Sequence, residues 1–291
     1  GNSLTEISPD IHKCRSLKSL DIRGNLLQDL TCLYKCDHLV DLRADYNHIN
    51  SIDNPNWPKM VALSVSNNNM CKVEFDHKML HLRILDLSGN RIGLLPDGFF
   101  TFSPNVEYVN LNENQLTALP ESLGELAKMV KFTAAKNQLA ECTFEFAKMN
   151  KLKILDLHNN NLKRLSNDFW MAPMLTILNL SSNFFSCLPV PPAQGDVPLC
   201  NNLEELYMGE NQCRNEILLQ LANCRELRRL NLSMNDIYDF PNGLSCFGRL
   251  TELYLSHNQL SSLPDDINKL TRLKVLCVNN NRLSTLPGEL C

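Results

Sequence analysis

The sequence lacks the features that mark most nucleic-acid-binding, membrane and secreted proteins. Its 28 basic and 32 acidic residues leave a formal net charge of -4, which argues against binding a nucleic acid or an acidic membrane through bulk charge. No apolar run approaches the ~18 residues that a membrane-spanning helix needs. No charged stretch followed by an apolar one opens the chain. We therefore expect a protein without a transmembrane segment or targeting leader.

Catalytic and metal-binding motifs are also missing. The chain contains no G-x-S-x-G, no G-x-x-x-x-G-K and no H-E-x-x-H, and its seven histidines are scattered. Adjacent carboxylates such as Glu204 and Glu205 are expected on solvated faces. Cys32 and Cys36 are the closest cysteine pair, and without a C-x-x-C motif zinc binding is not expected. The sequence thus predicts no catalytic residue, metal site or cofactor within these 291 residues.

What the sequence does contain is an excess of two residue types, with 52 leucines and 35 asparagines. They fall into the frame L-x-x-L-x-L-x-x-N-x-L, seen for example at Leu85, Leu87, Asn90 and Ile92. Twelve asparagines hold the same place in this frame, 21 to 28 residues apart: Asn25, Asn47, Asn68, Asn90, Asn114, Asn137, Asn160, Asn183, Asn211, Asn235, Asn258 and Asn281. The frame and its spacing are those of leucine-rich repeats.

The frame predicts an α/β solenoid, a leucine-rich repeat horseshoe. Each L-x-L pair is expected to form a short strand with one buried face, and the stacked strands to form a concave parallel sheet. The asparagine amide can both donate and accept, so it should satisfy backbone groups where the chain leaves each strand. Short helices or irregular segments should return along the convex side, with brief helices at residues 121–126 and 265–270.

We predict one domain over residues 1–291, with about 12 full repeats and a partial N-terminal one at Asn2, Leu4 and Ile7. The longest step holds four prolines within residues 189–198, which predicts a surface insertion, and residues 216–222 after it should be helical. Neither end carries a polar cap, and the last residues stop within a repeat. We therefore expect a segment of a longer chain.

The cysteines follow the phase of the repeat. Cys14, Cys36, Cys200 and Cys224 precede a frame by three residues, a position that elsewhere holds large apolar residues such as Trp57. These four, with Cys142, Cys213 and Cys277 at frame or strand positions, are predicted to be core residues. Because disulfide-bonded caps are absent, we expect a reducing, cytoplasmic location.

Partner binding is predicted on the concave face. The residues between the paired leucines line this face and include Arg43, Tyr207 and Tyr254, with Arg229 close by. Tyrosine and arginine are enriched at interaction hot spots. The candidate binding residues are Arg23, Arg43, Lys131, Tyr207, Arg229 and Tyr254. The group of Arg23, Asp41, Arg43 and Asp45 could bind a charged partner or pair within itself.

Several repeats contain the pair L-P after the frame, as at Leu119-Pro120 and Leu263-Pro264. These L-P pairs and the spacing of about 23 residues resemble the Ras-linked class of leucine-rich repeat proteins. Within it, the chain is most similar to the repeat region of fungal adenylate cyclases. The resemblance is carried by LRRLNLSMNDIYDFP at residues 227–241, LTELYLSHNQLSSLP at 250–264, LKVLCVNNNRLSTLPGEL at 273–290 and NLSSNFFSCLPVPP at 179–192.

This resemblance implies a parent protein that makes cyclic AMP from ATP with Mg2+, through a catalytic domain outside these residues. It also implies a Ras-type small GTPase as partner, through which the protein could lie at the inner face of the plasma membrane. Two alternatives stay open: a leucine-rich-repeat protein phosphatase with a phosphatase-2C-like domain, and a free-standing signalling scaffold. The residues that follow Cys291 in a longer chain would separate the three.

Overall fold

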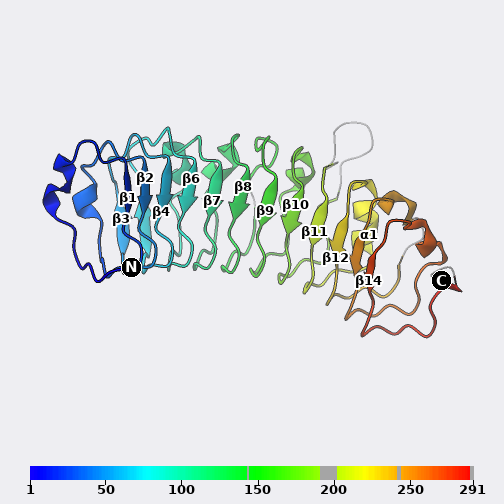
Figure 1. Ribbon diagram of the computed structural model, residues 1–291. Helices are drawn as coiled ribbons and strands as arrows, with labels where there is room; N and C mark the ends of the chain where they lie inside the picture. Colours follow the sequence, from blue (N-terminus) through cyan, green and yellow to red (C-terminus); the bar gives the residue numbers. More distant parts are fainter. Residues whose placement is uncertain (143, 191–201, 241–243, 289–291) are drawn as a thin grey trace. The chain divides into compact units, whose positions relative to one another are not determined.

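The computed structural model describes residues 1–142, 144–190, 202–240 and 244–288. The chain forms two compact units, the first of residues 1–139 and 143–151, the second of residues 140–142 and 152–291. Each unit repeats the same strand, turn and return segment along the chain (Figure 1). The repeat predicted from the sequence therefore continues through both units.

Short strands form a parallel sheet in the first unit. They are β1 (Ser19–Asp21), β2 (Asp41–Arg43), β4 (Ala62–Ser64), β6 (Ile84–Asp86), β7 (Tyr108–Asn110) and β8 (Lys131–Thr133), paired in this order. Middle residues pair with middle residues, so Leu42 and Leu63 lie side by side and both are fully buried. The first leucine of each L-x-L pair therefore points into the core.

The second unit repeats this arrangement. Its strands are β9 (Ile154–Asp156), β10 (Ile177–Asn179), β11 (Glu205–Tyr207), β12 (Arg229–Asn231), β13 (Glu252–Tyr254) and β14 (Val275–Cys277), again parallel and in register. Leu206, Leu230 and Leu253 are the buried middle residues. The predicted leucine-rich repeat solenoid with a parallel sheet is confirmed.

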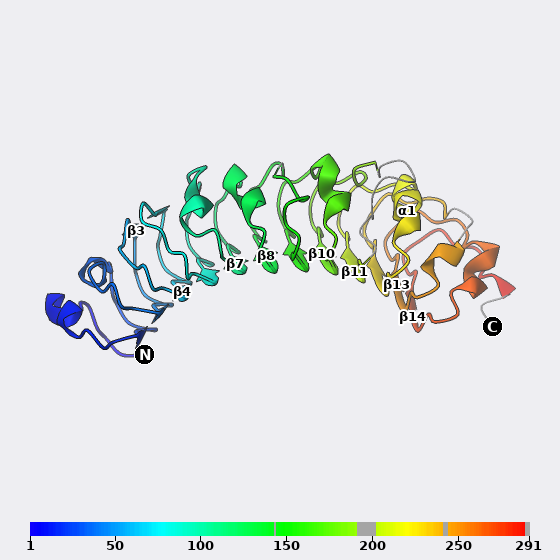
Figure 2. The same ribbon diagram turned by 90° about the horizontal axis from the view of Figure 1, so that it is seen from above.

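Most return segments contain 3-10 helices, on the side of each unit away from the strands (Figure 2). They are η1 (Pro9–Lys13), η2 (Thr31–Leu33), η3 (Phe99–Phe102), η4 (Glu121–Glu125), η5 (Asn167–Met171), η6 (Leu221–Asn223), η7 (Leu244–Phe247) and η8 (Asp265–Lys269). The helices predicted at 121–126 and 265–270 are η4 and η8. Pro120 and Pro264 precede them with φ -67°, a value that the proline ring fixes and that suits a helix start.

The repeat that follows the insertion is more helical, as predicted. It contains the α-helix α1 (Glu216–Gln220), continued by η6. The predicted insertion at 189–198 lies outside the described residues from 191 onward. Its start is held by the Trp170 indole, whose Nε1 donates to the carbonyl oxygen of Pro189 at 2.8 Å.

A second, two-stranded parallel sheet in the first unit was not predicted. It pairs β3 (Ser51–Asp53) with β5 (Lys72–Glu74), and Ile52 and Val73 are its buried middle residues. Both triplets place an apolar residue between polar ones, which is the strand pattern on a very short scale. Three residues are too few for that pattern to be distinguished from a return segment in the sequence alone.

Most of the cysteines predicted to be core residues are buried. Cys36, Cys142, Cys213 and Cys224 are inaccessible, and Cys277 is partly exposed. The prediction is wrong for Cys14, which is exposed at the C-terminal end of η1. Among the described residues, the helix that Cys14 ends packs on η2. Cys200 lies outside the described residues.

The frame asparagines tie neighbouring repeats together. Oδ1 of Asn68 accepts a hydrogen bond from the backbone of Ile49 (3.0 Å), and Nδ2 donates to the carbonyls of Ala44 and Val65 (both 3.1 Å). The same bonds to the preceding repeat are made by Asn47, Asn90, Asn114, Asn137, Asn183, Asn211, Asn235, Asn258 and Asn281. Asn25 accepts from the backbone of Leu4, and Asn160 donates to the carbonyl of Leu157. One side chain thus forms hydrogen bonds with backbone groups of its own repeat and of the preceding repeat.

The residue before each of these asparagines has a left-handed backbone. Gly24 and Gly89 have φ of 65° and 64°, and the other ten have values from 53° to 57°. The sequence does not predict this feature, because residues as different as Lys136 and Met234 occupy the position. The turn is therefore imposed by the stacking of repeats and by the asparagine bonds, since residues such as Lys136 and Met234 adopt it although their side chains do not favour it.

Candidate protein-binding face

The outward side chains of the strands form what we call the strand face of each unit. In most strands the residues on either side of the buried middle one are accessible, as the alternation of a strand requires, whereas Thr133 of β8 is buried. The register places Asp21 beside Arg43 in the first unit and Tyr207 beside Asn231 in the second. The rows read from the sequence are therefore real rows of neighbouring side chains.

Five residues of β11, β12 and β13 form one hydrogen-bonded group, which we call the Arg229 cluster: Glu205, Tyr207, Arg229, Glu252 and Tyr254. Nε and Nη2 of Arg229 bind the two carboxylate oxygens of Glu252 at 2.6 and 2.8 Å. Nη1 of Arg229 lies 3.2 Å from Oε1 of Glu205 and donates to the Tyr207 hydroxyl at 3.0 Å. The Tyr207 and Tyr254 hydroxyls donate to Glu205 (2.7 Å) and Glu252 (2.9 Å). The guanidinium therefore fixes Tyr207 directly and Tyr254 through Glu252.

The bonds of the Arg229 cluster shift the pKa values of its members. Hydrogen bonds from Arg229 and then Tyr254 lower the pKa of Glu252 to about 2, and the bond to Glu252 raises the pKa of Arg229. Burial raises the pKa of Tyr207, and the bond to Glu252 raises that of Tyr254. At neutral pH the cluster holds two carboxylates and one guanidinium, a net charge of -1. It does not present an unbalanced positive charge.

The two predicted arginines of the first unit are also paired. Arg23 binds both carboxylate oxygens of Asp21, with Nε donating to Oδ1 at 2.9 Å and Nη2 donating to Oδ2 at 2.6 Å. Hydrogen bonds from the Arg23 side chain and backbone lower the pKa of Asp21 to about 2. Arg43 lies 3.3 Å from Asp41. Of the two interpretations left open for the mixed-charge group, pairing between its members is seen for Arg43, whereas Arg23 pairs with a carboxylate outside the group.

The remaining member of that group, Asp45, is turned inward. It is 7% exposed and accepts hydrogen bonds from the Ser66 backbone and hydroxyl, both at 2.8 Å, and from the Ser64 hydroxyl. A carboxylate held by three donors of neighbouring repeats supports the sheet. It is not presented to a partner.

Lys131 differs from the predicted arginines because it is exposed and, among the described residues, has no carboxylate within ion-pair distance. Its strand neighbours in register are Tyr108 and then Ile84, which are 43% and 45% exposed. Tyr108 and Ile84 were not predicted, although they share their row with the predicted Lys131, because the pattern followed along all repeats was the row between the leucines. An aliphatic, an aromatic and a cationic side chain thus lie in one row.

The structure brings Tyr207, Arg229 and Tyr254 together in the second unit. Arg23, Arg43 and Lys131 lie in the first unit, with Lys131 several strands from the two arginines. Within the described residues, no three His, Cys, Asp or Glu side chains are grouped so as to hold a metal ion. No helix in the described part of the chain is long and apolar enough to cross a membrane.

Comparison with known families agrees with this architecture. Models described as leucine rich repeat match residues 81–139 and 151–171, and a model of two copies of the repeat matches residues 249–289. The matched stretches include strands and frame asparagines of both units. The repeat is therefore recognised independently of the structure.

Related proteins share the repeat with this chain. The adenylate cyclase of Schizosaccharomyces pombe is 24% identical over 268 residues, which cover 83% of this chain and 16% of the cyclase. Podocan-like protein 1 of Mus musculus is 30% identical over 66% of this chain and 38% of its own length. A PHLPP-like protein phosphatase of Drosophila melanogaster is 33% identical over 44% of this chain and 14% of its own. The chain spans only a minor part of each relative.

Solved structures show the same fold. An internalin of Listeria monocytogenes superimposes with a TM-score of 0.81 at 19% identity, covering 100% of this chain and 82% of that one. A leucine-rich repeat protein of Leptospira interrogans gives 0.75 at 21% identity, covering 97% and 77%. The chain is therefore a leucine-rich repeat solenoid, and its sequence is similar, over most of its length, to part of a fungal adenylate cyclase.

Proposed function

We propose that the chain is the regulatory repeat region of an adenylate cyclase. In this proposal its strand face binds a Ras-type small GTPase and so controls cyclic AMP synthesis by a Mg2+-dependent catalytic domain elsewhere in the parent protein. Similarity to the Schizosaccharomyces pombe enzyme over 83% of the chain supports the parent's identity. Binding of a protein partner is the common use of stacked repeats. A structural neighbour, the plant receptor RGFR1, was solved in complex with RGF2.

The observation that carries the proposal is the Arg229 cluster. Tyr207 and Tyr254 are fixed on the strand face before any partner arrives, so binding would cost little further side-chain entropy. Tyrosine and arginine are the residue types that dominate interface energies. Because the cluster has a net charge of -1, its attraction to a partner rests on the aromatic rings and their hydroxyls, and only secondarily on charge.

A binding measurement with Ras tests the proposal directly. The purified chain should bind Ras loaded with a GTP analogue more tightly than Ras loaded with GDP. Replacing Tyr254→Ala should weaken binding about tenfold, or ~1.4 kcal/mol. Tyr238→Ala is the matched control, because Tyr238 is 54% exposed in the same unit but lies outside the strands. Equal affinity for the two nucleotide states, or equal loss in the control, would contradict the proposal.

The charge contribution is best tested at Lys131. Reversing Arg23, Arg43 or Arg229 would break ion pairs of the fold, whereas Lys131 has no carboxylate partner among the described residues. The family resemblance implies that the switch regions of Ras carry acidic residues, which would attract Lys131. Lys131→Glu should therefore reduce the rate of association with Ras at low salt. Lys59→Glu, at an exposed lysine outside the strands, should leave the rate unchanged.

The protein phosphatase is the second candidate, favoured by the 33% identity to the Drosophila melanogaster protein over 132 residues. The two candidates differ in the chemistry of the parent protein. Assays of the natural full-length protein should show conversion of ATP to cyclic AMP and no release of phosphate from a phosphopeptide. Phosphate release without cyclic AMP synthesis would establish the phosphatase. The absence of both activities would favour a scaffold.

A further inference from the structure

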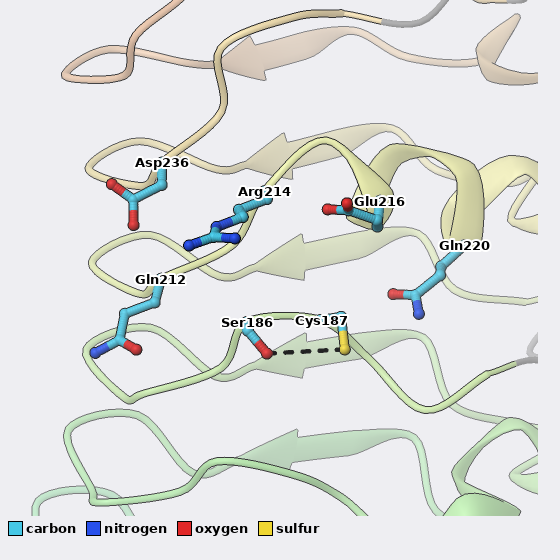
Figure 3. Close-up of a pocket in the computed structure, with 7 residues that line it drawn as sticks. All are labelled: Ser186, Cys187, Gln212, Arg214, Glu216, Gln220 and Asp236. Carbon is cyan, nitrogen blue, oxygen red and sulfur yellow. Dashed lines mark hydrogen bonds between the residues drawn. The ribbon is translucent and has the colours of Figure 1, made fainter.

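A groove runs across several repeats of the second unit, beside the turns that leave the strands and away from the strand face. It consists of two cavities of about 790 and 400 Å³ that share Ser186 and Gln212. Lys163 and Phe184 line the larger cavity, and Arg214 and Glu216 line the smaller one (Figure 3). Because the two cavities share lining residues, they adjoin each other along one groove.

The groove results from side-chain length at one position of the repeat. The third and fourth residues after the frame asparagine are Lys163 and Arg164 in one repeat and Arg214 and Asn215 two repeats later. The repeat between them has Ser186–Cys187, both exposed. Two short side chains between longer ones leave a trough, and α1 (Glu216–Gln220) forms one of its walls.

The floor of the groove is rigid. The backbone of Phe184 donates to the carbonyl of Leu162 (2.8 Å), and the backbone of Gln212 donates to the carbonyl of Phe185 (2.9 Å). Gln220 of α1 closes a two-way bond with Leu188, accepting from its N–H at 2.9 Å and donating to its carbonyl at 2.8 Å. A floor bonded on both sides needs no rearrangement to receive a ligand.

Two cations without an ion-pair partner among the described residues flank this floor. Among the described residues, neither Lys163 nor Arg214 has a carboxylate within ion-pair distance, and Figure 3 shows the guanidinium of Arg214 extending over the trough. At the spacing of neighbouring strands, positions two repeats apart are separated by about 10 Å. A carboxylate lying over Ser186 could therefore interact with both cations. Glu216 and Asp236, in the smaller cavity, disfavour a more highly charged anion such as phosphate.

The groove also offers apolar and amide contacts. Phe184 is 44% exposed where it lines the larger cavity, and Gln212 presents an amide beside it. An amide can bond to the backbone of an extended chain, and an exposed ring can receive an aliphatic side chain. We propose that this groove binds an extended peptide segment of a protein partner, with an acidic side chain over Ser186 between Lys163 and Arg214 and an apolar side chain on Phe184. The groove lies outside the strand face, so it can bind a peptide whether or not the strand face binds a GTPase.

Selection from a displayed library of random heptapeptides tests this assignment. Peptides selected on the wild-type chain should contain an acidic residue close to an apolar one. By fluorescence polarisation they should bind at least tenfold more weakly to Ser186→Trp, which fills the trough. Ser261→Trp should bind normally, because Ser261 is exposed at the same repeat position but lines neither cavity. Failure to enrich any peptide, or equal binding to both variants, would overturn the proposal.

A charge exchange tests the orientation of the peptide. The Arg214→Glu variant should bind the selected acidic peptide at least tenfold more weakly than the wild-type chain. The same variant should bind a peptide in which Asp is replaced by Lys more tightly than the wild-type chain does. Arg164→Glu, whose side chain is 79% exposed and lies outside the groove lining, should change neither affinity. Bound peptide should also slow alkylation of Cys187 in the groove but not of exposed Cys71 in the first unit. Unchanged affinity in Arg214→Glu, or equal protection of both thiols, would overturn the assignment.

Discussion

Arg229 of β12 donates two hydrogen bonds, of 2.6 and 2.8 Å, to the carboxylate of Glu252 on β13, so neighbouring repeats are joined by a charged pair on the strand face. The same guanidinium holds the Tyr207 hydroxyl, and Glu252 holds the Tyr254 hydroxyl. Substitutions within such a connected group are not additive. A loss of binding in any one member should therefore be interpreted for the cluster as a whole.

The stability of the Arg229–Glu252 pair should depend on pH. The pKa of Glu252 is about 2 in the folded chain, below its ordinary value of 4.5, so the pair stabilises the fold above about pH 4.5 and loses this effect as pH falls toward 2. Glu252→Gln should lower the melting temperature at pH 7, and its difference from wild type should shrink at pH 3. Thermal unfolding followed by circular dichroism measures both. A difference independent of pH would refute the assignment.

The asparagine bonds can be tested with two adjacent residues. Asn68→Ala removes an acceptor and a donor that serve Ile49, Ala44 and Val65, and should cost ~1–3 kcal/mol of unfolding free energy because backbone groups are left unpaired. Asn69→Ala is the control, since this neighbouring side chain is partly exposed and makes no hydrogen bond among the described residues. Urea denaturation compares the two. Equal stability of both variants would contradict the role of Asn68.

A side chain at the left-handed turn before Asn90 should destabilise the fold, because at Gly89 it would also meet Asn67. A Cβ on Gly89, whose φ is 64°, would lie 2.7 Å from Oδ1 of Asn67. Gly89→Ala should therefore be destabilised by ~1–2 kcal/mol from the backbone conformation alone, with the steric contact in addition. A Cβ added at Gly93 has no atom within 4 Å, so Gly93→Ala should have the unfolding free energy of wild type or a slightly higher one. If Asn67→Ala restores part of the loss in Gly89→Ala, the contact is confirmed.

Cysteine reactivity should separate the two classes of thiol. Cys14, Cys71 and Cys187 are exposed, and we expect iodoacetamide to label them rapidly in the folded chain at pH 8. Burial raises the pKa of Cys213 to about 12 and also raises that of Cys142, so both should react only after unfolding. Peptide mass spectrometry gives the modified sites. Early labelling of Cys213 would show that its repeat opens under native conditions.

The repeat register was predictable because it rests on local spacing. Leu85, Leu87 and Asn90 recur in phase with their counterparts in other repeats, and each has the burial that its position requires. The same reasoning failed at Cys14, where the position in the frame is that of a core residue but the side chain is exposed. The position of a residue in the repeat predicts the direction of its side chain, whereas its burial also depends on the segments that pack around it.

The candidate site was predictable only in part. The row containing Tyr207 and Tyr254 follows from the alternation of the strand. The pairing of Arg229 with Glu252 does not, because it depends on rotamers of residues 23 positions apart. The groove beside Ser186 was not anticipated either, since it arises from side-chain lengths compared across three repeats.

The sequence by itself determined the repeat, the buried leucines and the asparagine positions, because these follow from short-range periodicity and the hydrogen-bonding capacity of one side chain. Only the tertiary structure decided which charges remain free. It leaves Lys131, Lys163 and Arg214 without a carboxylate partner among the described residues, while Arg23, Arg43 and Arg229 are paired. Whether a charge is free depends on distances between repeats, and those distances are set by stacking, which a linear pattern does not contain.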